Sequence, residues 1–154
     1  MIRAPHPRPS GAGWGELAAV WSRLVKAPVA RLATVTSEGR VDLVPFVFAP
    51  IGDDRLVSAV DHKPKKTTAL QRLTNIGHTP AVTVLADHYA EDWTELWWVR
   101  ARGVARVHPS PAGVSGALEA LVSKYSQYRE VEPTGPLIEI SVTDLRSWSA
   151  DGSL

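Results

Sequence analysis

The feature that most constrains the fold of this chain is a period of two in residues 97–107. The odd positions there are all uncharged, whereas the even positions include Arg100, Arg102 and Arg106. Successive side chains of a β-strand point to opposite faces, so this spacing predicts one long strand with a basic face and an uncharged face. We expect the uncharged face to line the protein core.

The other periodic segments predict a mainly β fold with flanking helices. Strands are expected at residues 29–36, 41–49, 55–60, 81–86 and 137–142, in addition to a long strand at 95–107. Helices are expected at residues 14–27, 62–77 and 114–125, where apolar residues recur at helical spacing. Short turns should join the first three strands into an antiparallel meander. Strands with only brief helical crossovers favour an antiparallel barrel over a doubly wound sheet.

The length and composition suit one soluble domain. The chain has 154 residues, of which 44% are hydrophobic and 21% are charged, as is typical of globular proteins. Prolines and glycines interrupt residues 1–13 too often for regular structure. We therefore expect a flexible N-terminal arm at 1–13 and a single domain at 14–154.

Charge, cysteine content and hydropathy exclude several classes of function. The net charge of +1 gives no global reason to expect a nucleic-acid partner. The chain has no cysteine, which excludes disulfides and thiol catalysis and favours a cytoplasmic protein. No stretch approaches the roughly 18 apolar residues that a membrane span needs. The five histidines lack metal-ligand spacing, so no metal site is predicted.

Two groups of cations are candidate anion-binding sites. The first lies between residues 61 and 87, in an interval without acidic residues that contains Lys63, Lys65, Lys66 and Arg72. Cations at the start of a helix can hold a phosphate or a polycarboxylate, because the helix N-terminus adds backbone N–H donors. The alternative is a solvated basic turn, since charge runs are common on exposed loops.

The second group is the arginine ladder, which we define as Arg100, Arg102 and Arg106 on one strand face. Such a face could hold an anionic ligand or pair with carboxylates of a partner subunit. The alternative is a solvent face with salt bridges to Asp42, Glu95 or Glu139.

Aromatic and apolar residues add two expectations. Trp93, Trp97 and Trp98 lie close together in the sequence, and Trp148 lies near its end; these indoles could either stack a planar cofactor or pack the end of a barrel. Apolar residues occupy both alternating sets of positions in the strand at 41–49. A small barrel leaves one strand face in water, so we expect a partner subunit or a helix to cover the second face, and we predict a homodimer.

Several segments, taken in order, resemble a known family. They are PVARLATV at 28–35, EGRVDLVP at 38–45, DHKPKK at 61–66, LQRLTNI at 70–76, DHY at 87–89, EDW at 91–93 and LWWVR at 96–100. Together they are similar to the pyridoxamine-phosphate-oxidase-like, FMN-binding split β-barrel proteins. Within that group they resemble the PPOX-class branch that uses the deazaflavin coenzyme F420.

This resemblance implies a cofactor groove between the two subunits of a homodimer. Its implied ring contacts are Asp42, Leu43, Val44 and Pro45. Its implied phosphate contacts are Ser58, Lys63, Lys65, Lys66 and Arg72. Trp97 and Trp98 are implied to lie near the ring or the tail of the cofactor, across the dimer interface.

The resemblance also implies an oxidoreductase that transfers a hydride between coenzyme F420 and a small organic substrate. The cofactor carries that chemistry, so no catalytic acid or base of the chain is expected. One alternative is an oxidase or reductase that depends on flavin mononucleotide (FMN). The other alternative is a non-catalytic carrier of coenzyme F420, a flavin or haem.

Overall fold

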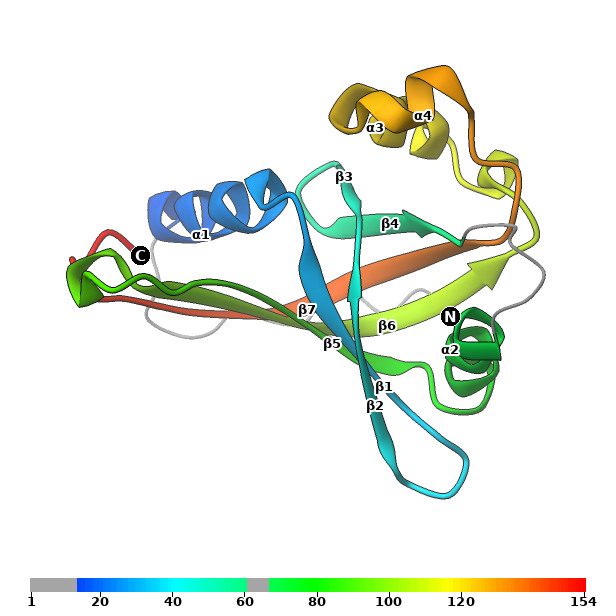
Figure 1. Ribbon diagram of the computed structural model, residues 1–154, viewed down its shortest axis with the longest axis horizontal. Coiled ribbons are helices and arrows are strands. Elements are labelled where there is room, and N and C mark those ends of the chain that lie inside the picture. The colour runs from blue at the N-terminus through cyan, green and yellow to red at the C-terminus, as the bar shows by residue number, and fades with distance from the viewer. Residues whose placement is uncertain (1–13, 61–66) are drawn as a thin grey trace.

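The structure is a computed structural model that describes residues 14–60 and 67–154 (Figure 1). The expected arm at 1–13 and the cations Lys63, Lys65 and Lys66 lie outside the described residues. In chain order the elements are α1 (Trp14–Lys26), β1 (Ala30–Val35), β2 (Val41–Phe46), β3 (Ala49–Ile51), β4 (Arg55–Ala59), α2 (Thr67–His78), β5 (Ala81–His88), η1 (Trp93–Glu95), β6 (Trp97–His108), η2 (Pro111–Gly113), α3 (Ala117–Lys124), α4 (Ser126–Glu130) and β7 (Leu137–Ser149). No described helix is long and apolar enough to cross a membrane.

The described strands form one seven-stranded sheet in the order β2-β1-β5-β6-β7-β4-β3, and every neighbouring pair is antiparallel. The longest ladder joins β6 to β7, from Trp97 opposite Ser149 to His108 opposite Leu137, and Figure 1 shows the two strands side by side. This arrangement confirms the expected mainly β fold with flanking helices, and it is consistent with a split β-barrel.

The period of two in residues 97–107 is confirmed in β6. Val99 and Ala101 are buried, whereas Arg102 and Arg106 are exposed. We call the side of the sheet that carries Val99 and Ala101 the inner face, and the side that carries the arginine ladder the outer face. The inner face lines the main core, as expected.

The predicted meander is wrong beyond its first hairpin. The expected strand at 41–49 forms two strands, β2 and β3, which lie at opposite edges of the sheet. β4 therefore pairs with β3 and β7 and not with β2. The chain leaves the ladder at Phe48, whose backbone N–H donates to the Tyr125 hydroxyl at 3.0 Å and whose side chain is fully buried. That partner lies far along the sequence, so local periodicity could not reveal the break.

Two helices cover the inner face. Val20 and Leu24 of α1 and Ile76 of α2 pack with buried side chains of the sheet into the main core. α1 contacts β6 and β7, whereas α2 contacts β6 and β1, and Figure 1 places the two helices over opposite ends of the sheet. Because this core fills the inner side, further partners of the sheet must lie on its outer face or at its edges.

One end of the outer face is covered by α3. Leu121 of this helix packs with Val57 of β4 and Leu137 of β7 in a second buried cluster. The helix expected at 114–125 is present as α3; η2 precedes it, and α4 follows it after Tyr125. The described helices therefore leave the other end of the outer face uncovered.

A bulge in the β6–β7 ladder explains why the last strand is longer than expected. The register shifts between Arg102 and Gly103, and a Cβ at Gly103 would meet the Ser141 carbonyl oxygen at 2.4 Å. Ile140 faces the inner side, whereas Asp144 pairs with Arg102 on the outer side. The period of two is therefore broken inside β7, which hides the second half of the strand from a search for alternation.

Candidate functional site

The uncovered end of the outer face spans five strands. The strand register places Pro45, Arg31, Leu85, Arg100 and Arg146 in one row across β2, β1, β5, β6 and β7. The neighbouring row contains, in the same strand order, Leu43, Ala33, Thr83, Arg102 and Asp144. We call these two rows, together with the outer-facing pair Trp98 and Trp148 and the outer-facing Val41, the open region.

The open region exposes large apolar side chains. Val41 and Leu43 are each 66% exposed, and Trp148 is 46% exposed. Trp148 lies directly opposite Trp98 in the β6–β7 ladder. The exposed apolar side chains therefore lie at both sides of the open region, on β2 and on β7, and exposed large apolar groups favour contact with a ligand or another protein.

The charges of the open region are only partly paired. Arg31 contacts Asp87 with 3.2 Å between Nη1 and Oδ1, and Arg146 contacts Asp144 with 3.4 Å between Nε and Oδ1. Among the described residues, no ion pair involves any member of the arginine ladder. The surface therefore keeps positive charge that its own carboxylates do not neutralise.

Arg100 shows this imbalance most clearly. It lies directly opposite Arg146 in the ladder, and like charges at such positions repel each other. Its guanidinium carbon is 5.9 Å from the centre of the Trp98 ring. Its Nε is buried without a hydrogen-bond partner within the described part of the chain. An unsatisfied cationic donor next to a second arginine fits an anionic group.

The carboxylates that could have paired with the ladder are engaged elsewhere. Asp42 accepts a hydrogen bond from Asn75, at 2.8 Å from Oδ2 to Nδ2. Glu139 accepts from Arg55 at 2.8 Å and contacts Nε2 of His108 at 3.0 Å. These contacts do not support the alternative of a ladder neutralised by salt bridges to Asp42 or Glu139.

A second polar cluster joins α2 to the edge of the sheet. Asn75 is 1% exposed, and its Nδ2 donates to Thr34 Oγ1 at 3.0 Å as well as to Asp42. Its Oδ1 accepts from Nε2 of Gln71 at 2.8 Å. The Asn75 amide therefore fixes α2 against β1 and β2, with both ends of the amide satisfied.

Arg72 lies on α2 next to this cluster. Burial lowers the pKa of its guanidinium, and its Nε is buried without a partner among residues 14–60 and 67–154. Like Arg100, this side chain presents a cationic donor that the described chain leaves unsatisfied. The two arginines are thus the described groups that best fit the acidic parts of an anionic cofactor.

The implied ring contacts on β2 divide between the two faces. Asp42 and Val44 point to the inner side with Thr34 and Leu32, whereas Leu43 and Pro45 belong to the open region. β2 is an edge strand of the sheet. A ligand would reach both sets of side chains only by lying along that edge.

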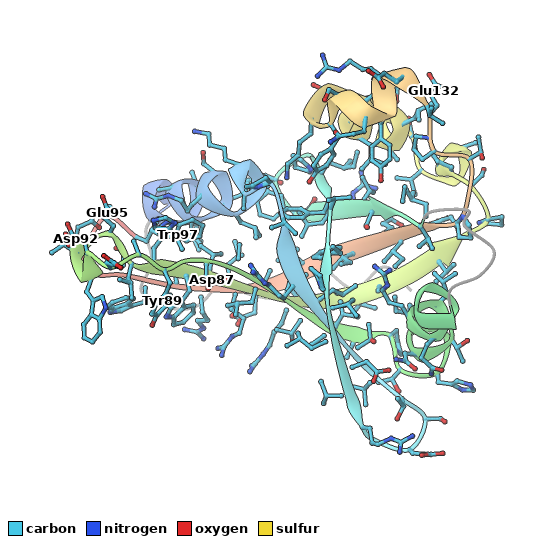
Figure 2. All side chains as sticks on the ribbon, in the orientation of Figure 1. Asp87, Tyr89, Asp92, Glu95, Trp97 and Glu132 are labelled. Carbon is cyan, nitrogen blue, oxygen red and sulfur yellow. The ribbon has the colours of Figure 1, made fainter. Side chains whose placement is uncertain are left out.

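Trp97 and Trp98 also lie on opposite faces. Trp97 stacks on His88 with 6.5 Å between ring centres, and the Arg23 guanidinium carbon is 5.1 Å from the Trp97 ring. Figure 2 shows Trp97 on the α1 side of the sheet and Tyr89 on the other side. The structure therefore brings Trp98, and not Trp97, together with the ladder.

Ser58 is buried between the two cores. It is 2% exposed, and its hydroxyl donates to the Val47 carbonyl oxygen at 2.7 Å. Its implied contact with a phosphate stays a prediction, because the described structure gives its hydroxyl a partner within the protein.

Sequence reasoning missed Arg146, and it named Trp148 as a candidate stacking or packing residue without placing it beside Trp98. Both lie in the part of β7 beyond the bulge, where they complete the outer face beside Arg100 and Trp98. The even spacing of Asp144, Arg146 and Trp148 was the available signal, but the change of phase at the bulge separates it from the apolar run at 137–142.

Known structures have the same fold at low sequence identity. One is a conserved hypothetical protein from Mycobacterium tuberculosis, with 18% identity over 86% of this chain and 84% of that chain and a TM-score of 0.65. Others are an FAD binding protein from Mycobacterium smegmatis (16% identity, 86% and 94% covered, TM-score 0.54) and a heme binding protein from the same organism (15% identity, 91% and 60% covered, TM-score 0.64). At these identities the likeness shows the fold alone.

The sequence itself shows the family. No curated protein matches the chain. The family model described as Pyridoxamine 5'-phosphate oxidase matches residues 16–149, which include every described strand and helix except the first turn of α1. The antiparallel sheet and its flanking helices agree with that match, and the chain belongs to the pyridoxamine 5'-phosphate oxidase family.

Proposed function

We propose that this protein is an oxidoreductase that binds coenzyme F420 and transfers a hydride between this deazaflavin and a small organic substrate. Two copies of the chain pair through the open region, and the cofactor lies in the groove between them. The observation that carries the proposal is the arginine ladder, whose members form no ion pair within the described chain and which lies beside exposed aromatic and apolar side chains.

The proposed pairing follows from the composition of the open region. Exposed Val41, Leu43 and Trp148 favour burial against another apolar surface. Two identical surfaces that both carry excess arginine repel each other unless anions lie between them. A cofactor with phosphate and carboxylate groups supplies these anions, so dimer formation and cofactor binding support each other.

Each part of the proposed site has a distinct task. Arg72 holds the phosphate, together with Lys63, Lys65 and Lys66 as the family resemblance implies. Leu43, Pro45 and Trp98 form an apolar wall that excludes water from one side of the ring. The deazaflavin, when bound, supplies the hydride-transfer chemistry, so the chain needs to orient it rather than to provide an acid or a base.

The length of the cationic surface favours the deazaflavin over FMN. FMN ends at its phosphate, whereas coenzyme F420 carries a further tail with glutamate carboxylates. Arg72 could serve either phosphate, but the ladder adds Arg100 and Arg102 in the open region on another face of the sheet, whereas Arg106 lies opposite Glu139 toward the end under α3. A site that binds only FMN has no use for this second set of charges.

A carrier of coenzyme F420, a flavin or haem is the second candidate. The observation that favours it is that the chain shares its fold with an FAD binding protein and a heme binding protein. The carrier and the enzyme differ in whether hydride leaves the bound cofactor.

The test is a fluorescence titration of the purified protein with coenzyme F420 and with FMN, side by side. We expect tighter binding of the deazaflavin and a dimeric mass by light scattering at micromolar concentration. Tighter binding of FMN would favour the FMN-dependent alternative. A monomeric mass would contradict a cofactor groove between two subunits. A reduced deazaflavin that binds but transfers hydride to none of a panel of small acceptors would promote the carrier alternative.

A further inference from the structure

Lys124, at the end of α3, lies in a site that the proposed function does not use. Its Nζ donates to the Ala27 carbonyl oxygen at 2.8 Å, just beyond the last turn of α1. The same nitrogen is 3.8 Å from the centre of the Phe48 ring, which is fully buried. Lys124 forms no ion pair with a carboxylate of the described residues. Its amine is therefore held in place by a carbonyl and an aromatic face and by no negative charge.

A cavity opens beside this amine. It has a volume of about 350 Å³ and is lined by Val25, Pro50, Ala120, Ser123 and Lys124. Apart from Lys124 and the Ser123 hydroxyl, these side chains are apolar. The cavity is large enough for a molecule of a few carbon atoms, and among the described residues Lys124 is the only one in its lining that carries an amine.

Burial also changes the protonation of the amine. It lowers the pKa of Lys124 to about 8, because the charged form loses its hydration among apolar neighbours. Half of these amines are neutral at about pH 8, whereas an ordinary lysine of pKa about 10.4 is then less than about 1% neutral. A neutral amine carries the lone pair that attacks an electrophilic carbon, and lysines in apolar pockets are activated in this way.

We propose that Lys124 and its cavity form a covalent binding site for short aliphatic aldehydes. The neutral Nζ attacks the aldehyde carbon, and a C–N bond forms as the carbonyl oxygen takes up a proton. The resulting carbinolamine loses water, which carries away the aldehyde oxygen and the two amine hydrogens, and an imine remains. The reaction is a reversible condensation that needs no oxidant or reductant. The apolar wall of the cavity selects an alkyl chain, and the Ser123 hydroxyl is the polar group of the wall next to the reacting carbon.

The contacts of Lys124 explain why the site is specific to this lysine. The hydrogen bond to Ala27 and the contact with the Phe48 ring hold Nζ in one place, and the Lys124 side chain forms part of the cavity wall. Lys26 has no such enclosure, because its side chain is exposed at the end of α1. Lys26 therefore serves as an internal reference on the same molecule.

The experiment uses the full-length protein, butanal and sodium cyanoborohydride, which reduces an imine to a stable alkylamine. Peptide mass spectrometry after chymotryptic digestion measures the initial labelling rate at each lysine. At about pH 8 we expect Lys124 to be labelled about tenfold faster than Lys26, with a pH profile that levels off above about pH 8. Equal rates at the two lysines, or a Lys124 rate that keeps rising to about pH 10, would overturn the proposal.

Two variants test the role of the amine and the role of the cavity independently. Lys124→Arg keeps a cation next to Ala27 and Phe48, so the thermal melting temperature should stay close to that of the parent while the fast labelling phase disappears. Ser123→Leu fills the cavity from its exposed rim and should slow the labelling of Lys124 at least about fivefold, with Lys26 unchanged. Persistence of the fast phase in Lys124→Arg, or unaltered Lys124 labelling in Ser123→Leu, would contradict the assignment.

Discussion

The two ends of the outer face differ in whether their charged side chains are paired within the chain. At the end under α3, Glu139 accepts from Arg55 at 2.8 Å and contacts His108 at 3.0 Å, and Leu121 seals the apolar layer beside them. We call this end the closed region. In the open region, Leu43 on β2 is exposed, and Arg100 and Arg146 lie opposite each other in the β6–β7 ladder, where like charges repel. One sheet therefore carries one region whose charges are paired and whose apolar side chains are buried, and another region where both are exposed.

The difference separates residues that stabilise the fold from residues that our proposal assigns to a second subunit and a cofactor. A chain that folds alone gains nothing from placing Arg100 opposite Arg146 or from exposing Leu43 to water. Both features become favourable once an apolar surface and anions cover them. The closed region shows that the same sheet can satisfy its charged groups internally where α3 covers it.

The largest expected effect is on the closed region. Leu121→Ala removes a fully buried side chain from the cluster under α3, and we expect the free energy of unfolding to fall by about 2–5 kcal/mol. Urea denaturation of the variant and the parent measures this loss. A loss below about 1 kcal/mol would mean that α3 is not packed as closely as the comparison requires.

The next effect concerns the charges of the closed region. Glu139→Gln leaves Arg55 and His108 without their carboxylate and should lower the free energy of unfolding by about 1.5–3 kcal/mol near neutral pH. Burial alone would raise the pKa of Glu139, but the hydrogen bonds from His108 and Arg55 outweigh burial and lower it.

The lowered pKa of Glu139 sets the pH dependence of that variant. A depressed folded-state pKa contributes stability above the ordinary glutamate pKa, and this contribution is lost as the pH falls through the folded value. The gap between the parent and Glu139→Gln should therefore close in acid. Urea denaturation across the acid range measures the gap, and a gap that stays constant would show that the ionised carboxylate is not what stabilises this end.

Removal of a cation from the proposed cofactor site should weaken cofactor binding and leave the stability of the fold almost unchanged. Arg72→Ala removes a buried, unpartnered donor, and we expect the affinity for coenzyme F420 to fall roughly ten- to a hundredfold with little change in melting temperature. Arg40→Ala is the matched control, because that arginine is exposed in the β1–β2 turn and pairs only with Glu38. Equal affinities for all three proteins would show that Arg72 takes no part in binding.

The smallest expected effect on stability is in the open region. Leu43→Ala makes the same chemical change as Leu121→Ala, but on a side chain that is 66% exposed. At protein concentrations where the subunits separate, we expect a change below about 0.5 kcal/mol in the free energy of unfolding. Light scattering should at the same time show a weaker dimer. A loss as large as that of Leu121→Ala would erase the distinction between the two regions.

The sequence predicted the parts of the fold that depend on local periodicity. The alternation in 97–107 identified β6, its apolar face and the arginine ladder, because side-chain direction in a strand follows from position alone. The break between β2 and β3 escaped prediction because it depends on Tyr125, which lies far along the chain. The length of β7 escaped prediction because its bulge reverses the phase of the pattern.

The candidate site was predictable to a similar degree. Arg72 could be identified as a cation in an interval without acidic residues, and the ladder as three arginines on one face of a strand. The sequence could not show which carboxylates pair with these cations. In the structure Asp42 accepts a hydrogen bond from Asn75 on α2, and Glu139 accepts one from Arg55 on β4. Pairing across a sheet is a property of strand order, and the strand order here differs from the order in the sequence.

The central claim is that the excess positive charge of the open region serves the long anionic tail of a deazaflavin. The direct measurement is the affinity for coenzyme F420 and for FMN as a function of salt, in the parent and in Arg102→Gln. The Debye length falls from about 10 Å at 0.1 M to about 3 Å at 1 M, so exposed contacts with carboxylates weaken over this range. We predict a steeper salt dependence for the deazaflavin than for FMN, and a smaller difference between the two in Arg102→Gln. Equal salt dependences in the parent, or tighter binding of FMN at every salt concentration, would contradict the claim.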